Sequence, residues 1–176
     1  MAFGSVSAAH ATIVECPSDA DVLAGSFNRQ YGVETSPDSS CYAYGGGNLN
    51  GAGNDAFLQL DPSFTWVDDP FDPTGTDFAG TSGEFLIDNF DPTLQYALGI
   101  KDGGTPKWAV FLLPIGVSSG TWHVLSSGGA LSHLALYSTD TPPDPGEEPL
   151  VPEPATLALL GLGLLVGGAR ARRLRR

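Results

Sequence analysis

Four side chains with oxygen atoms suited to a metal ion lie within one glycine-rich stretch, residues 45–55. They are Asn48, Asn50, Asn54 and Asp55. Amide and carboxylate oxygens are the hard ligands that calcium prefers, and glycines allow the backbone to wrap around an ion. The stretch lacks the acidic spacing of an EF-hand and the repeated nonapeptides of calcium-binding β-helices. We therefore expect a turn without a metal here, with a calcium loop as the alternative.

Residues that could catalyse a reaction are few and scattered. The three histidines, His10, His123 and His133, have no H-x-H or H-E-x-x-H companion. The sequence also lacks a G-x-S-x-G nucleophile motif, a P-loop and a dinucleotide-binding fingerprint. Glu84 and Asp88 could form the carboxylate pair of a glycoside hydrolase, but an acid-rich chain offers many such pairs. We expect a protein that is not an enzyme and needs no cofactor.

Aromatic side chains offer a different chemistry, because they can stack against the apolar faces of sugar rings. The candidates are Trp66, Trp108, Trp122, Tyr42 and Tyr44. Burial in a hydrophobic core explains the three tryptophans equally well. The sequence does not decide between the two interpretations.

Short strands must position these side chains. Residues 42–140 contain apolar or alternating runs separated by turn sequences, and we find no convincing helical period before the C-terminal tail. The runs predict strands at Ala56–Leu60, Phe64–Val67, Glu84–Asp88, Gln95–Lys101, Lys107–Leu113, Thr121–Leu125 and His133–Ser138. This spacing predicts an all-β domain over residues 12–140, either a β-sandwich or a jelly-roll-like fold.

Three of these runs also predict faces and neighbours. Residues 108–113 are apolar on both faces, which predicts a central strand. Asp102-Gly103-Gly104 predicts a hairpin between the strands that flank it. Period-two alternation groups Tyr96, Leu98 and Ile100 on one face, and separates Leu134 and Leu136 from His133, Ala135 and Tyr137.

Charge is distributed very unevenly along the 176 residues. Residues 1–150 contain 19 acidic residues and only three basic ones (Arg29, Lys101 and Lys107), whereas residues 151–176 contain one acid and five arginines. A nucleic acid partner is disfavoured, because phosphate backbones are bound by clustered lysine and arginine. A basic tail on an acidic chain instead suggests a segment that faces a membrane.

The tail itself is uncharged from Ala155 to Ala169 and then ends in an arginine cluster. We expect one short hydrophobic helix, about 22 Å long at 1.5 Å per residue, that enters the membrane. The alternative is a helix buried in a protein core. The membrane segment includes Ala155, Leu157, Leu160, Leu162, Leu165 and Val166. The cytoplasmic anchor that the positive-inside rule predicts comprises Arg170, Arg172, Arg173, Arg175 and Arg176.

Pro152, Glu153 and Pro154 directly precede this hydrophobic segment. Pro-Glu-Pro, a short Gly/Leu-rich helix and a terminal arginine cluster, in that order, closely resemble the PEP-CTERM sorting signal of Gram-negative bacteria that make exopolysaccharide. The resemblance covers residues 151–176. It implies recognition and processing at or near Pro-Glu-Pro by an exosortase, a membrane-embedded cysteine transpeptidase.

The N-terminal residues 1–11 are interpreted as the remnant of a signal peptide. They end in Ala9-His10-Ala11, an A-x-A cleavage pattern, which places the mature N-terminus near Thr12. In an exported chain, the pair Cys16 and Cys41 predicts a disulfide, with free thiols as the alternative. Two cysteines without a histidine pair are too few for a structural zinc site.

The stretch between the domain and the tail is rich in proline and acid. Residues 141–150 predict an extended spacer that holds the domain off the membrane. Before it, Ser119-Gly120-Thr121-Trp122 and residues 131–138 (LSHLALYS) resemble the ending of small PEP-CTERM ectodomains. That second resemblance supports the domain boundary near residue 140 and assigns no chemistry.

These expectations lead to three hypotheses. The first is an exported protein, anchored in the inner membrane as a precursor and then delivered to the cell envelope or extracellular matrix. There it would have a structural or adhesive role in the exopolysaccharide or biofilm matrix. The second is a carbohydrate-binding module with a specific glycan ligand. A hydrolase is the third and least favoured, because no catalytic constellation emerges from the sequence.

Overall fold

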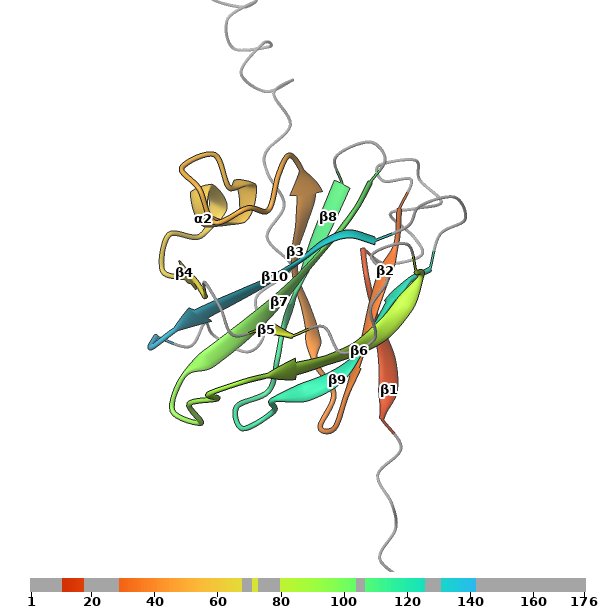
Figure 1. Ribbon diagram of the computed structural model, residues 1–176, viewed down its shortest axis with the longest axis vertical. Coiled ribbons are helices and arrows are strands. Elements are labelled where there is room, and N and C mark those ends of the chain that lie inside the picture. Colours follow the sequence, from red (N-terminus) through yellow and green to blue (C-terminus); the bar gives the residue numbers. More distant parts are fainter. Residues whose placement is uncertain are drawn as a thin grey trace, which may run out of the picture.

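A computed structural model describes residues 11–17, 29–67, 71–72, 80–103, 107–125 and 131–141. This part of the chain forms two five-stranded sheets and one short helix, with antiparallel pairing at every strand contact (Figure 1). The strands are β1 (Thr12–Cys16), β2 (Tyr31–Thr35), β3 (Ser40–Gly46), β4 (Thr65–Trp66), β5 (Phe71–Asp72), β6 (Ser82–Ile87), β7 (Gln95–Asp102), β8 (Lys107–Leu112), β9 (Ser119–Val124) and β10 (Leu131–Thr139). The helix is α2 (Ala56–Leu60).

The chain moves repeatedly between the two sheets. The first sheet has the order β1-β2-β9-β6-β5, and the second has the order β3-β8-β7-β10-β4. Of the strand-to-strand connections, only β1–β2, β5–β6 and β7–β8 join neighbours in one sheet. The all-β architecture is therefore as expected. The β7–β8 pairing also confirms the hairpin predicted at Asp102-Gly103-Gly104.

Apolar side chains from both sheets meet in the main core. Its largest fully buried members include Tyr31 and Val33 from β2, Phe85 from β6, and Leu98 and Phe111 from β7 and β8. Burying side chains of this size contributes roughly 1.5–3 kcal/mol each before the cost of conformational entropy. The arrangement is a β-sandwich, with one sheet on each side of this core.

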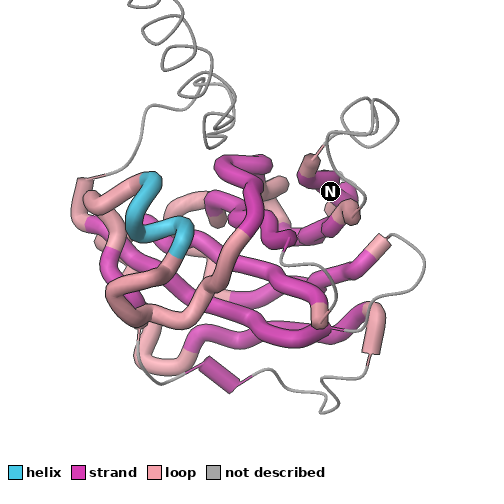
Figure 2. The backbone as a smooth tube through the Cα atoms, turned by 90° about the horizontal axis from the view of Figure 1, so that it is seen from above, coloured by secondary structure: helices cyan, strands magenta, loops and turns pink. Residues whose placement is uncertain are grey.

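The second sheet is buried on its outer face as well. Ala43, Ala97, Trp108, Val110, Ala135 and Tyr137 form a second apolar cluster with Leu49, Phe57 and Phe64. The last three come from α2 and its flanking loops, which lie at the periphery of the strands in both views (Figures 1 and 2). Strand β8 lies between β3 and β7, which explains why residues 108–113 are apolar on both faces and confirms the predicted central strand.

The predicted faces of β7 and β10 are also confirmed. Tyr96, Leu98 and Ile100 belong to the main core, as do Leu134 and Leu136, whereas Ala135 and Tyr137 pack under α2. One predicted strand was wrong, because Ala56–Leu60 is the helix α2. Five residues are too few to show a helical period. The helix is instead set by Asp55, whose side chain caps its first turn.

Candidate functional site

The predicted ion-binding residues lie together around the start of α2, but their oxygens are used by the protein itself. Asp55 is fully buried. Its Oδ1 accepts hydrogen bonds from the amides of Phe57 and Leu58, both at 3.0 Å. Its Oδ2 accepts from the amides of Asn50 (2.7 Å) and Gly51 (2.8 Å) and from the Tyr137 hydroxyl (3.0 Å). Five donors therefore occupy this carboxylate.

The asparagines of the same loop bond mainly to one another and to the backbone. Asn50 Nδ2 donates to Asn54 Oδ1 at 3.1 Å, and Asn50 Oδ1 accepts from the Ala52 amide at 3.2 Å. The Asn48 carbonyl accepts from the Ala56 amide at 2.7 Å. The described parts of the chain contain no group of three or more His, Cys, Asp or Glu residues that could hold a metal ion. This loop is built as a helix cap.

His123 lies on the outer face of the first sheet, within a short chain of hydrogen bonds. Its Nε2 is 3.2 Å from Thr121 Oγ1, which donates to Glu34 Oε2 at 3.4 Å. Glu84 is opposite Thr121 on the neighbouring strand, whereas Asp88 lies beyond the end of β6. The strand register thus places Glu34, Thr121 and Glu84 side by side on three neighbouring strands, in a row that does not include Asp88. Alternation along each strand could have shown which side chains share a face. The order of the strands was needed to show that Glu34, Thr121 and Glu84 are neighbours.

A hydroxyl bonded to an imidazole is the start of a nucleophile–base pair. Catalysis would also need a group that orients the imidazole and donors for a developing negative charge. Among the residues that the structure describes, Thr121 is the hydrogen-bond partner of the His123 imidazole. Glu34, Thr121 and His123 therefore form a row of hydrogen-bonded polar side chains on the outer face of the first sheet.

The aromatic candidates have separate environments. Trp108 is fully buried and its indole N–H donates to the Gly46 carbonyl at 2.9 Å. Trp122 is also buried, in the main core. Tyr42 donates its hydroxyl to Asp61 Oδ2 at 2.6 Å, and Tyr44 packs against the main core. These four side chains therefore take part in packing or hydrogen bonding within the domain.

Trp66, like Tyr42, is partly exposed and has a polar neighbour, which in its case is an imidazole. It is half-buried on β4, with its ring centroid 5.8 Å from that of His133 and an interplanar angle of 20°. It also meets Tyr137 edge to face at 5.5 Å. Burial, reinforced by the positive charge of Lys101, lowers the pKa of His133, against a smaller opposing effect of Asp55.

A buried ion pair joins the two sheets where β2 begins and β7 ends. Arg29 Nε lies 2.7 Å from Asp102 Oδ2, and the side chain of Asp102 is inaccessible to solvent. Tyr31, next to this pair, donates its hydroxyl to the Lys107 carbonyl at 2.9 Å. Burial and the charge of Asp102 raise the pKa of Tyr31, so the phenol remains protonated. The ion pair between Arg29 and Asp102 therefore links the two sheets.

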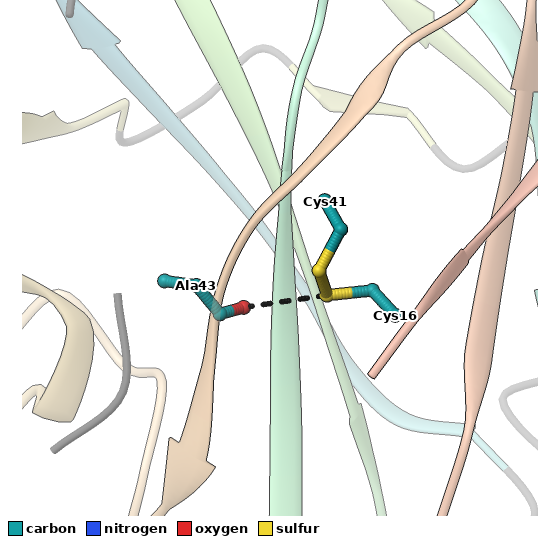
Figure 3. Close-up of a disulfide and its surroundings, with 3 residues drawn as sticks. All are labelled: Cys16, Cys41 and Ala43. Carbon is teal, nitrogen blue, oxygen red and sulfur yellow. Dashed lines mark hydrogen bonds between the residues drawn. A yellow bond between two sulfur atoms is a disulfide. The ribbon is translucent and has the colours of Figure 1, made fainter. Parts of the chain in front are cut away.

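Cys16 and Cys41 form a disulfide that connects the edge strands β1 and β3 (Figure 3). The Cα atoms are 5.2 Å apart, and Cys16 Sγ lies 3.8 Å from the Ala43 carbonyl oxygen. The β3–β8 register shifts between Cys41 and Ala43. Cys41 and Tyr42 face opposite sides by normal alternation, and the irregularity lets the neighbours Tyr42 and Ala43 both pack on the α2 side. The disulfide joins the two sheets at one side of the sandwich.

The predicted sorting residues Pro152, Glu153 and Pro154, the hydrophobic segment and the arginine cluster lie outside the described residues, as do residues 1–10 and 142–150. Within the part of the chain that is described, no helix is long and apolar enough to cross a membrane.

Comparison with known families identifies the tail. The PEP-CTERM protein-sorting motif matches residues 150–176. Neither a curated protein nor a solved structure matches the chain.

Together, the sandwich and the tail define a class: an exported, mostly β-strand protein that an exosortase targets. More specifically, the chain is a PEP-CTERM sorting domain-containing protein.

Proposed function

We propose that the chain is delivered to the cell envelope or the extracellular matrix, where its sandwich has a structural or adhesive role without catalysis. The observation that carries this proposal is the sorting motif at residues 150–176, directly behind a folded two-sheet domain and an acidic, proline-rich stretch. The precursor is held in the inner membrane by residues 155–169, with the arginines on the cytoplasmic side. Exosortase then cleaves at or near Pro-Glu-Pro.

The chemistry of the motif supports this processing step. Pro152 and Pro154 have a fixed φ and cannot donate backbone hydrogen bonds, and both properties disfavour a helix at the motif. Cleavage there separates the five arginines from the domain and releases a product more acidic than the precursor.

The disulfide and the second apolar cluster support a durable extracellular domain. Cys16–Cys41 connects the sheets at one side, and α2 covers the outer face of one sheet. Disulfides persist in oxidising compartments, which agrees with export. A domain built this way would hold its shape as part of a matrix.

Fractionation of cells with and without the exosortase tests the proposal. The variant Pro152→Ala/Glu153→Ala should accumulate as an uncleaved precursor in the membrane fraction, as should the wild-type chain in cells that lack the exosortase. Glu148→Ala/Pro149→Ala is a matched control with the same residue types four positions earlier, and it should be processed normally. Normal release of the Pro152/Glu153 variant would refute the assignment.

A further inference from the structure

Lys101 is a basic residue that the fold of this acidic chain leaves without a partner. Residues 1–150 contain only three lysines and arginines. Arg29 is paired with Asp102, and Lys107 has an interaction of its own. The side chain of Lys101, half-buried on β7, makes no ion pair or hydrogen bond with the residues that the structure describes. A cation in this position is available to a ligand.

His133 lies directly opposite Lys101 in the β7–β10 register. Its Nε2 is buried and has no hydrogen-bond partner among the described residues. A buried polar atom without a partner costs free energy, so such an atom requires an explanation. The strand register is irregular between Leu131 and His133, which indicates local adjustment at this position.

Trp66 completes the cluster, which we call the Lys101–His133–Trp66 patch. The indole stacks on the imidazole and lies against Gly51, where a side chain would overlap the ring. Phe57 contacts Trp108 and Tyr137, the neighbours of this patch on the same sheet face. All three patch residues remain partly exposed. The patch therefore lies beside the region that α2 covers.

We propose that the Lys101–His133–Trp66 patch binds a carboxylate-bearing sugar residue of a polysaccharide. The Lys101 ammonium would pair with the carboxylate, and Trp66 would contribute apolar surface to the ring. A rotation of the His133 imidazole would bring its buried, unpartnered Nε2 to the sugar, where it would gain a hydrogen bond. The charge of Asp55 does reach His133, but its buried carboxylate accepts hydrogen bonds from five donors. Exposed acidic side chains farther away are screened over about 8 Å at physiological ionic strength.

This inference rests on the proposed function, since a matrix protein must contact matrix polymer, but it is tested independently of sorting. The probe is polygalacturonate, and fully methyl-esterified polygalacturonate serves as its neutral counterpart. Binding to the full chain in detergent micelles is measured by affinity electrophoresis or calorimetry. The wild-type chain should bind the acid form and not the ester.

Four variants then locate the site. Lys101→Gln and His133→Gln should each weaken binding about tenfold or more, because the first loses the ion pair with the carboxylate and the second loses a hydrogen bond to the sugar. Lys101→Arg should retain it, and Lys107→Gln should bind as the wild type does. Melting temperatures verify that each variant is folded. Equal binding of acid and ester, no binding of the acid form, or undiminished binding by Lys101→Gln would overturn the site while leaving the exosortase result unaffected.

Discussion

The carboxylate of Asp55 and the hydroxyl of Tyr137 are joined by a hydrogen bond of 3.0 Å, although 82 residues separate them along the chain. Both side chains are fully buried. The bond connects the cap of α2 to β10, the last strand of the domain. Burial, followed by the charge of Asp55, raises the pKa of Tyr137, so the phenol stays a donor across the accessible pH range.

Replacing Asp55 should destabilise the domain more than any other substitution in its loop. Asp55→Ala removes the helix cap and leaves the amides of Asn50 and Gly51 without their acceptor. Loss of a cap costs about 0.5–2 kcal/mol, and the buried Tyr137 hydroxyl that also loses its acceptor adds about 1–3 kcal/mol. We expect a loss on the order of 3 kcal/mol in the free energy of unfolding, measured by denaturant titration.

Tyr137→Phe provides the comparison within the same network. It removes one hydrogen bond and keeps the ring that packs on Phe57, so a loss of about 1 kcal/mol is expected. The double variant should lose less than the sum of the two, because the residues share one interaction. Additive losses would show that the bond does not contribute. Asn54→Ala, at the exposed side of the loop, should have little effect.

Removal of the disulfide should weaken the domain without changing its fold. The cysteines are 25 residues apart, and closing a loop of this size stabilises by roughly 3 kcal/mol in the chain-entropy treatment. Cys16→Ala/Cys41→Ala should therefore unfold at lower denaturant concentration and lose its sensitivity to reducing agent. Equal stability of the variant and the oxidised wild type would contradict this expectation.

Acidification should destabilise the domain through His133. Its pKa is lowered in the folded state, chiefly by burial and then by Lys101, with Asp55 opposing. The unfolded chain therefore takes up a proton near pH 6.5 that the folded chain does not. The stability that depends on a neutral His133 is fully present above pH 6.5. It is lost as the pH falls toward the pKa of His133 in the folded state. Unfolding titrations at pH 7.5 and 5 measure the loss.

The matched variants for this effect are two histidine substitutions. His133→Gln should reduce the difference in stability between pH 7.5 and 5. His123→Gln, on the other sheet, should retain more of it. If both variants keep the full difference, the pH dependence arises elsewhere.

The β architecture could be predicted because period-two alternation is visible within a single strand. In β10, for example, Leu134 and Leu136 face the main core, whereas Ala135 and Tyr137 face the α2 side. Strands β1, β2 and β3 were not predicted, because their apolar runs are short and interrupted by glycine and polar residues. Helix α2 was not predicted, because the side chain of Asp55 caps its first turn and no helical period marks it in the sequence. The pairing of His133 with Lys101 could not be predicted, because it depends on which strands become neighbours.

Gly120 should not tolerate even a methyl group. Strand β9 approaches β2 so closely there that a Cβ atom would lie 2.5 Å from the Glu34 carbonyl oxygen and 2.9 Å from Phe85. The backbone oxygen is held in the sheet and cannot move aside as a flexible side chain could. Gly120→Ala should therefore cost about 1–3 kcal/mol, the range for overpacked interiors. Gly53→Ala is the control, because a Cβ atom there would meet nothing within 4 Å. Denaturant midpoints of the two variants decide the matter, and similar values for both would show that β9 can shift away from β2.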